Sequence, residues 1–447
     1  MYSFGPGLAF VPIGLYIAPL MKIISNVTFD RKELFRSCCI ILLSGLHMLK
    51  IAFKAVTLML LIVIIEAKCN RSIMANPVTI TVPSSGYETI QKAVNAASLG
   101  DTIMVAAGIY AENLIINKTI SLIGGDPTTT IIDGSGKDVL IINTHSVAIN
   151  GFTIQNGKEW PYCGIRISKC NFVTINNTML KNNFYGLQLL QSNNCKIFNS
   201  VIKNNSYAGI RISSSSNNVF FQDIIVNNSL GLESQNSPSN MLYHNNFINN
   251  TSQLRIYEST STILDNGAEG NYWSDYLGSD LNMDGIGDSK YAVAPAWDNY
   301  PLMSVFTNFT FHHESQRYFL STICNSTISN FQFDELHKKI SFDVSGSNGT
   351  MGFCRVALST RLAQGNYSVL IEGKAPAYIR NWTFSTYNYS YFTYEHTGII
   401  QKVTITLELP TTVVPPLMMV ITIIITSSLI VAMFIAAILM RRKRRKF

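Results

Sequence analysis

The loop at residues 280–288 carries the clearest pattern of metal-ligating side chains. Carboxylate or amide oxygens stand at its first, third, fifth and ninth positions, and glycine at the sixth allows a sharp turn. The spacing is typical of the first part of a calcium loop, where the seventh residue offers its backbone carbonyl. The predicted ligands of a structural Ca²⁺ ion are Asp280, Asn282, Asp284, Ile286 and Asp288. The twelfth position holds tyrosine instead of a bidentate glutamate, so a metal-free loop closed by Asx turns stays the alternative.

A second set of polar side chains recurs at one position of a repeated segment. The column reads Arg166, Gln188, Arg211, Glu233 and Arg255. If the repeats stack as strands, these side chains stand about 4.8 Å apart on one outward face. The favoured interpretation is a surface ion ladder, which contributes little stability. The alternative is a groove for an acidic polysaccharide, with Trp160 of an insertion at residues 158–162 beside it.

The sequence offers no clear set of catalytic residues. Glycosidases need two carboxyl groups about 5–9.5 Å apart on either side of one bond. The carboxylates at outward positions of the repeats are Asp223, Glu233 and Glu258, and they form no pair. A polysaccharide lyase would need a base beside carboxylates that hold a cation, and the pattern shows no such cluster. Catalysis is therefore disfavoured.

Copper handling is disfavoured on similar grounds, because it requires His, Met or Cys side chains together. His145 and His244 lie four repeats apart, roughly 19 Å along a stack of strands. Cys163, Cys170 and Cys195 lack Cys-x-x-Cys spacing. They are predicted to be small buried hydrophobic residues.

The elements that position these side chains are short repeats. Glycines recur at intervals of 22, 23 and 22 residues, and each is followed by an Asn-Asn pair. The glycines are Gly164, Gly186, Gly209 and Gly231, and the pairs begin at Asn182, Asn204, Asn227 and Asn249. Alternating aliphatic residues between these marks indicate short strands. A period of this length predicts a solenoid, and the absence of a 3.6-residue stripe argues against helical repeats.

The aligned columns predict a right-handed parallel β-helix with coils of about 22 residues. An earlier coil fits with Asp138 at the glycine position, which places Val139 and Ile141 inside, and a degraded last coil fits with Gln253 there. One Asn column is predicted to form an amide ladder between coils. Its members are Asn156, Asn182, Asn204, Asn227, Asn249 and Asn271.

The flanks supply the caps that an open end of a β-helix needs. Residues 88–97 predict a short amphipathic helix, followed by strands at 102–106, 113–116 and 119–123. The stretch TIQKAVNAASLGDTIMVAAGIYAENLIINKTISLIGG resembles the capping entry of pectin-lyase-like β-helices. The repeats, with the closing segment GNYWSDYLGSDLNMDGIGDSKY and DNYPLM, resemble the NosD family of β-helix proteins. The resemblance implies the fold over residues 77–303, and its name suggests an accessory role in metal-enzyme maturation.

A different pattern begins near residue 304. Seven alternating strands, at 327–333, 339–344, 351–358, 367–372, 382–386, 391–394 and 399–407, predict an immunoglobulin-like β-sandwich over residues 304–409. Cys324 and Cys354 lie within it and are predicted to form a disulfide.

The chain ends predict export and membrane anchoring. After a Pro/Thr linker at 410–416, residues 417–440 contain no charge and are long enough to span a bilayer. The basic run at 441–447 places that end in the cytoplasm and the bulk of the chain outside. Residues 1–69 contain an extension and a signal-like segment, which fits translation from Met48 and cleavage near Ala67. One or two additional amino-terminal spans are the alternative.

The charge balance excludes a nucleic-acid partner, because the basic tail supplies most of the net charge of +7. Sequons outside the repeats agree with an exported, glycosylated surface. They are Asn308, Asn325, Asn348, Asn366, Asn381 and Asn388. The leading prediction is a non-catalytic cell-surface scaffold or adhesin that binds glycan. The alternatives are a lyase or epimerase acting on acidic polysaccharide, and a NosD-like accessory protein.

Overall fold

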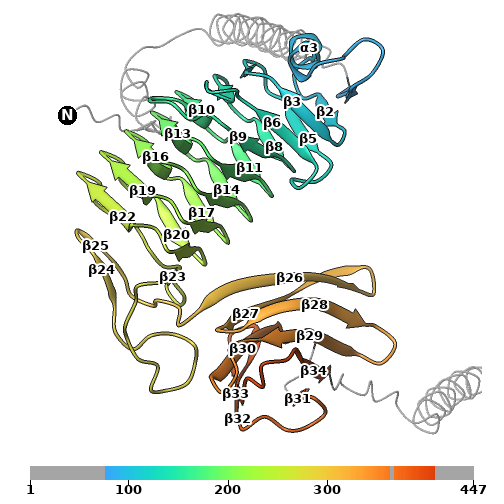
Figure 1. The fold of residues 1–447 in the computed structure, drawn as a ribbon, viewed down its shortest axis with the longest axis vertical. Helices are drawn as coiled ribbons and strands as arrows, with labels where there is room; N and C mark the ends of the chain where they lie inside the picture. Colours follow the sequence, from blue (N-terminus) through green and yellow to red (C-terminus); the bar gives the residue numbers. More distant parts are fainter. Residues whose placement is uncertain (1–75, 363–366, 408–447) are drawn as a thin grey trace, which may run out of the picture. The chain divides into compact units, whose positions relative to one another are not determined.

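The computed structural model describes residues 76–362 and 367–407. From Pro77 onward these residues belong to one compact unit. Within it, three parallel sheets are followed by antiparallel sheets, and short strands recur coil after coil (Figure 1). The chain therefore forms a parallel β-helix of the right-handed type, as the repeats predict.

Each coil contributes one strand to each parallel sheet. Sheet I contains β1 (Thr79–Val82), β2 (Thr102–Val105), β5 (Ser121–Gly124), β8 (Ala148–Asn150), β11 (Thr174–Asn176), β14 (Lys196–Phe198), β17 (Val219–Phe221) and β20 (Met241–Tyr243). Sheet II contains β4 (Leu114–Ile116), β7 (Leu140–Ile142), β10 (Cys163–Ser168), β13 (Tyr185–Leu190), β16 (Ala208–Ser213), β19 (Leu230–Gln235) and β22 (Ser252–Tyr257). Sheet III contains β3 (Gly108–Ala111), β6 (Thr130–Asp133), β9 (Thr153–Gln155), β12 (Met179–Lys181), β15 (Val201–Lys203), β18 (Ile224–Val226), β21 (Asn246–Ile248) and β23 (Tyr272–Trp273).

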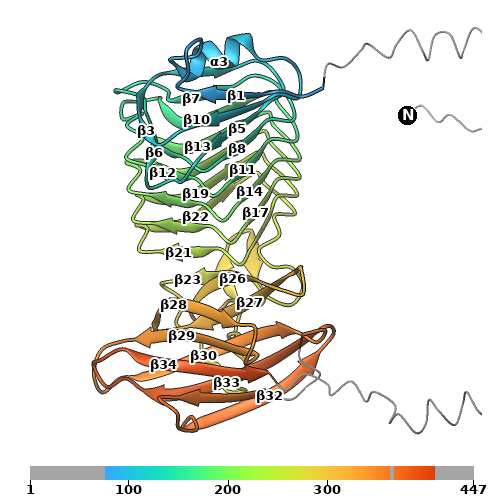
Figure 2. The same ribbon diagram turned by 90° about the vertical axis from the view of Figure 1, so that its right-hand side faces the viewer.

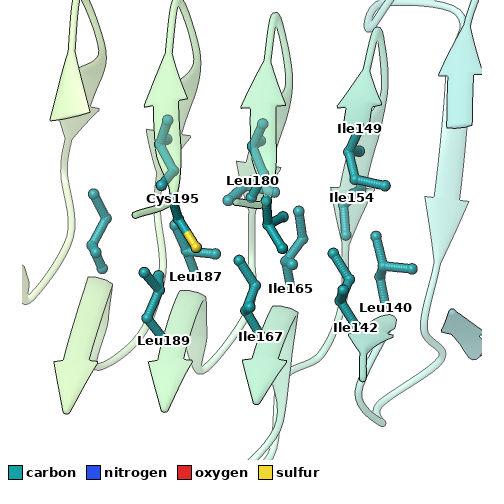
Figure 3. Close-up of a cluster of buried hydrophobic side chains, with 14 of the residues drawn as sticks. Leu140, Ile142, Ile149, Ile154, Ile165, Ile167, Leu180, Leu187, Leu189 and Cys195 are labelled. Carbon is teal, nitrogen blue, oxygen red and sulfur yellow. The ribbon is translucent and has the colours of Figure 1, made fainter. Parts of the chain in front are cut away.

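The register of the strands confirms the predicted columns. Ile165 pairs with Leu187, which pairs with Ile210, and the central residue of each three-residue strand from β11 onward in sheets I and III is buried. These aliphatic side chains fill one continuous core between the sheets (Figure 3). Burial of the columns supplies the main stabilisation, since a single 22-residue coil has no partner for its apolar face.

The first repeat was aligned one residue out of place. Ile165 and Ile167 pair with Leu140 and Ile142, so Val139 and Ile141 do not occupy the predicted positions. This coil is one residue shorter between sheets II and I, because Ile142 and Ile149 are seven residues apart while their partners Ile167 and Ile175 are eight apart. The last coil aligns as predicted at Leu254, Ile256 and Leu264, which follow Leu232, Ser234 and Leu242 in register.

The structure contains an amide ladder, but the second Asn of each pair forms it and not the predicted first one. Asn183 donates through its backbone N–H and Nδ2 to Oδ1 of Asn205, at 3.0 and 3.2 Å, and Asn228 continues the same pattern. The first Asn of each pair instead has a positive φ, such as 56° at Asn182, and forms the corner. Asn271 belongs to a different ladder, since it accepts from the N–H of Asn245.

Other corners carry ladders of their own. In one, the hydroxyls of Ser192, Ser215, Ser237 and Ser259 accept backbone N–H groups from the preceding coil. In another, the acceptors are Ser200, Asp223, Asn245, Asn271 and Asp298. Asp223 is thus fully buried and not outward-facing as predicted. These ladders satisfy buried backbone groups that the tight corners would otherwise leave unpaired.

Helix α3 (Ile90–Ala96) caps the amino-terminal end of the coils, as predicted (Figure 2). Thr89 is its N-cap, and the carboxylate of Glu112 accepts the N–H groups of Ile90 and Gln91, both at 2.9 Å. Negative charge at a helix N-terminus is favourable because the first N–H groups lack partners within the helix. The buried face of α3 covers the first strands.

The carboxyl-terminal end is closed by residues 270–303, which include the hairpin β24 (Tyr291–Val293) and β25 (Ala296–Asp298). Asp298 accepts the N–H of Asn271 at 2.7 Å and the indole N–H of Trp273 at 2.8 Å. Trp273 is fully buried and stacks on Phe247. The predicted closing segment therefore covers the open core.

Two antiparallel sheets follow, with a shared core from both. One sheet has the order β26-β27-β30-β33-β32 and the other β28-β29-β34-β31. The bounds are β26 (Val305–His313), β27 (Gln316–Cys324), β28 (Thr327–Asp334), β29 (Lys339–Ser345), β30 (Met351–Ser359), β31 (Tyr367–Ile371), β32 (Tyr378–Phe384), β33 (Tyr387–Glu395) and β34 (Gln401–Leu407). All seven expected strands are present, together with β26 and β27, which were not expected. The immunoglobulin-like topology stays a prediction.

No helix within the described ranges is both long and apolar enough to span a bilayer. The expected span at 417–440, the linker, the basic tail and the signal-like segment lie outside those ranges.

Candidate functional site

The side chains of the predicted outward column on sheet II are in register, but most of them pair with one another and are not open to a ligand. Arg166 forms an ion pair with Asp138 at 3.0 Å and donates to Gln188 at 2.7 Å. Arg211 lies 3.4 Å from Glu233. Gln188 and Glu233 are buried.

Of the predicted glycan face, Arg255 and Trp160 are the exposed members. The guanidinium of Arg211 is also occupied, because it donates to the Tyr185 hydroxyl at 2.7 Å and lies over that ring. This geometry favours the ion-ladder interpretation for the middle of the column, and glycan binding there stays a prediction.

The cysteines of the coils are buried. Burial raises the pKa of the Cys163 thiol to about 12 and that of Cys195 to about 11, which disfavours the thiolate that binds metal. No group of three or more His, Cys, Asp or Glu side chains in residues 76–362 and 367–407 is arranged to hold a metal ion.

Cys324 and Cys354 face one another across β27 and β30. Both are buried, and both are free thiols in this structure. The two cysteines of the predicted disulfide are thus direct cross-strand neighbours, and the disulfide itself stays a prediction.

The acidic loop at 280–288 closes on itself. Asp280 accepts the N–H groups of Asp284 and Gly285 at 3.0 and 2.9 Å, and Asp288 accepts that of Leu281 at 2.7 Å. Burial raises the pKa of Asp280, although the two hydrogen bonds lower it. Repulsion from Asp284 and Asp288 raises it further. Ile286 bridges Leu302 of the closing segment. Calcium binding stays a prediction.

A cleft of about 660 Å³ lies where sheet I of the last coils faces the β26–β27 hairpin. The β-helix side includes Asn176, Phe198, Asn199, Phe221, Gln222, Tyr243 and His244. The sandwich side includes Phe306, Asn308, Thr310, Arg317, Phe319, Ser321, Phe384, Tyr387 and Tyr389. The lining combines aromatic side chains with amide, hydroxyl and charged groups. A concave surface that pairs apolar rings with polar groups is a usual form of a ligand site.

The aromatic wall is built by the register of sheet I. Asn176, Phe198, Phe221 and Tyr243 occupy one outward column on successive strands. The Phe198 and Phe221 rings stack at 4.8 Å, and those of Phe221 and Tyr243 at 5.5 Å. Because the ring faces cover one another, this wall presents mainly ring edges to the cleft.

The opposite wall comes from one face of β26 and β27 together with Phe384 of β32 and Tyr387 of β33. Phe306 is anchored by Asn246, which donates to its carbonyl at 2.8 Å and accepts its N–H at 2.7 Å. Arg317 lies over the Phe319 ring, 5.3 Å from its centroid. Phe384 and Tyr387 are 64% and 40% exposed, so apolar ring surface is open to a ligand.

A charged cluster forms the end of the cleft. His244 lies 2.7 Å from one oxygen of Glu269, and Arg355 lies 2.7 Å from the other. Burial opposes ionisation of Glu269, but the charge of Arg355 and the hydrogen bond from His244 outweigh it and lower its pKa to about 2. His244 also stacks on Phe306 at 4.1 Å. Glu269 is therefore a fixed, paired carboxylate.

The sequence analysis did not find this cleft. Its walls come from coils and strands more than 200 residues apart in the sequence, from Asn176 to Tyr389. The outward aromatic column at Phe198, Phe221 and Tyr243 was the one signal in the repeats. The inward aliphatic columns define the repeat, and this outward column was not among the predicted site residues. None of the predicted site residues lines the cleft.

Residues 89–278 match the family model described as "Periplasmic copper-binding protein (NosD)". A cell surface glycoprotein of Methanothermus fervidus is 31% identical over 103 residues, which cover 23% of this chain and 17% of that protein. This chain thus spans about a sixth of that relative's length.

Solved structures of similar fold include pectin methylesterase PemA from Erwinia chrysanthemi. It is 15% identical, with a TM-score of 0.24, over 48% of this chain and 74% of that one. The A-module of a mannuronan C-5 epimerase from Azotobacter vinelandii is 13% identical, with a TM-score of 0.28, over 41% and 69% of the two chains. These likenesses say nothing of this chain's activity. Stacked coils in register, a capped end and the match over residues 89–278 together identify a NosD-like parallel β-helix.

Proposed function

We propose that this chain is a surface protein that binds carbohydrate without chemical turnover, in the cleft between its last coils and the β26–β27 hairpin. The outer location is supported by the likeness to a cell surface glycoprotein and to a periplasmic family. A scaffold or adhesin role follows from such a location combined with a ligand cleft.

The observation that carries the proposal is the composition of the cleft. On the sandwich wall, the exposed rings of Phe384 and Tyr387 can bury the apolar C–H faces of sugar rings, and the β-helix wall adds ring edges opposite them. Amide side chains, among them Asn199, Gln222 and Asn266, supply donors and acceptors for hydroxyl groups. Arg317 adds a cation at the sandwich wall, which favours an acidic or neutral sugar over a basic ligand.

Glu269 is poorly suited to serve as a general base in this cleft. A base that works near neutral pH needs a pKa close to that pH. Glu269 has a pKa of about 2 and is held between His244 and Arg355. It therefore acts as an ion-pair partner and not as a proton acceptor.

The test is binding of soluble acidic and neutral polysaccharides to residues 70–409 produced without glycosylation. Phe384→Ala removes exposed ring surface from the cleft wall and should weaken binding about fivefold, near 1 kcal/mol. Trp160→Ala removes an equally exposed ring from the sheet II side and is the matched control.

Retained affinity in Phe384→Ala with loss in Trp160→Ala would move the site to the sheet II column. Release of unsaturated or epimerised sugar by the wild-type protein would instead support the enzyme alternative. Copper that stays with the protein through purification would support the NosD-like accessory role.

A further inference from the structure

We propose that Asn308 carries an N-linked glycan and that this glycan lies in the cleft. The inference rests on the proposed function in one respect, since both place carbohydrate against the same aromatic walls, and the chain's own glycan would compete there with an external one. It adds a modification site and names a specific occupant, the chain's own glycan.

Strand β26 presents the whole sequon to the cleft. Alternate residues of a strand share a face, so Phe306, Asn308 and Thr310 point the same way, and all three line the cleft. Across the hairpin, Asn308 pairs with Ser321 and Thr310 with Phe319. A sugar attached to Asn308 would therefore start between the rings of Phe306 and Phe319.

The side-chain amide of Asn308 has a free nitrogen. Its Oδ1 accepts the Ser321 hydroxyl at 3.1 Å, and no described residue accepts a hydrogen bond from its Nδ2. Asn308 also borders a second hollow of about 200 Å³, lined by Gln222 and Asn246. The amide thus stands where two cavities meet, and Thr310 is exposed.

Other described sequons differ in this respect. Asn388 is buried, and Asn325 uses both ends of its amide on the backbone of Met351 and Phe353. Asn348 and Asn381 are exposed and line none of the cavities described above. Asn176 does reach the cleft, but the hydroxyl residue of its sequon, Thr178, is buried.

The modification needs an activated donor, a glycosyl phosphate on a lipid carrier. Nδ2 of Asn308 bonds to the anomeric carbon, the bond from that carbon to the phosphate oxygen breaks, and the lipid phosphate leaves with the electron pair. The amide nitrogen loses one proton, and no oxidant or reductant is involved. Once attached, the glycan has an effective concentration near the millimolar range, so weak contacts with the walls suffice to hold it.

The experiment uses the full chain purified from the organism that makes it. Trypsin releases residues 291–317 as one peptide, in which Asn308 is the single sequon. Mass spectrometry should find a glycan on this peptide. An unmodified Asn308 would overturn the proposal, whichever other sequons are occupied.

Placement of the glycan is tested by hydroxyl-radical footprinting of Tyr243 and Tyr387, which line the two walls. Thr310→Ala removes the sequon, and Thr310→Ser keeps it. Oxidation of both tyrosines should be at least threefold slower in wild type and Thr310→Ser than in Thr310→Ala. Tyr257, which is exposed outside the cleft, should not change.

Equal oxidation in all three proteins would show that the glycan projects into solvent, which contradicts the proposal. The polysaccharide-binding test above uses unglycosylated protein, so its failure and the failure of this proposal are separate outcomes.

Discussion

Asp223 is an ionisable residue in a fully buried position, where a charged carboxylate is unfavourable. It occupies a ladder position that Asn245 and Asn271 fill in the next coils. Its Oδ1 accepts the N–H of Ser200 at 2.8 Å, while Oδ2 has no hydrogen-bond partner in the described structure. Burial raises the pKa of this carboxyl well above its ordinary value, against the hydrogen bond from Ser200. The coil therefore accommodates Asp223 best as a neutral acid.

We expect Asp223→Asn to stabilise the β-helix at pH 7. The pKa of Asp223 is higher in the folded state than in the unfolded state, where it is about 3.8. The wild-type protein therefore has its full stability below about pH 3.8 and loses stability as the pH rises through the pKa of the folded state. The amide cannot ionise and can donate to a neighbouring acceptor, so the variant should gain about 1–3 kcal/mol at pH 7 and nothing near pH 3.

Urea unfolding at both pH values measures this difference. Asn245→Asp introduces the same problem one coil later and should lose stability at pH 7. A gain in Asp223→Asn that is equal at pH 3 and pH 7 would show that the effect is not ionisation.

At the scale of the element, the loop at 280–288 is where two predictions compete. Its side-chain oxygens accept backbone N–H groups, as in a metal-free Asx-turn loop. Its backbone carbonyls face the sandwich, where Arg380 donates to Asn282 and Met283. Burial, with a smaller contribution from repulsion by Asp284 and Asp288, raises the pKa of Asp280, and a bound cation would relieve that repulsion.

We expect 10 mM CaCl₂ to raise the melting temperature of residues 70–409. With a dissociation constant near 1 mM, typical of extracellular modules, the added stability is about 1.4 kcal/mol, or a few degrees. Asp284→Asn should abolish the shift. A shift no larger than that produced by NaCl at equal ionic strength would leave the loop as a metal-free turn.

The strands show why the sequence predicts some elements and not others. In the coils, a buried apolar column recurs every 22 or 23 residues, so the repeat identifies the strands even where outward residues such as Phe198 and Phe221 are apolar. Strands β26 and β27 are aromatic on both faces, because Phe311 and Leu320 enter the sandwich core while Phe306 and Phe319 line the cleft. That pattern hides the alternation, and both strands were missed.

The Asn pairs are a second case in which the sequence pattern is insufficient, because it does not tell which Asn of a pair enters the ladder. Both residues of a pair are amides, and only the left-handed φ of the first, with the inward turn that follows, decides which one enters the ladder. Composition cannot distinguish Asn182 from Asn183. The cleft could not be predicted from the sequence, because it forms only where the coils and the β26–β27 hairpin come together.

At the scale of the whole molecule, the ion pair of Glu269 and Arg355 connects the last coil of the β-helix to the sandwich. Arg355 is 2% exposed and also lies over the Tyr389 ring. Glu269→Gln would leave a buried guanidinium without its counter-charge, at a cost of about 3–5 kcal/mol. Addition of Arg355→Met in the double variant should recover part of that loss.

The effect should depend on pH in the opposite sense to that of Asp223. The pKa of Glu269 is lowered to about 2, so its contribution is present above the unfolded value near 4.5 and is lost as pH falls toward 2. Wild type and Glu269→Gln should therefore differ most at pH 7 and converge near pH 2. An equal difference at both pH values would indicate a packing effect.

The last prediction concerns how the molecule is held at a surface. Residues 417–440 are expected to span a membrane once, after cleavage of the signal-like segment near Ala67. Full-length protein should then need detergent for extraction, and a chain ending at residue 409 should be secreted in soluble form. Sequencing of its amino terminus should begin close to Lys68. If the chain ending at 409 stays in the membrane fraction with an intact amino end, the additional amino-terminal spans are real and the single-span prediction is wrong.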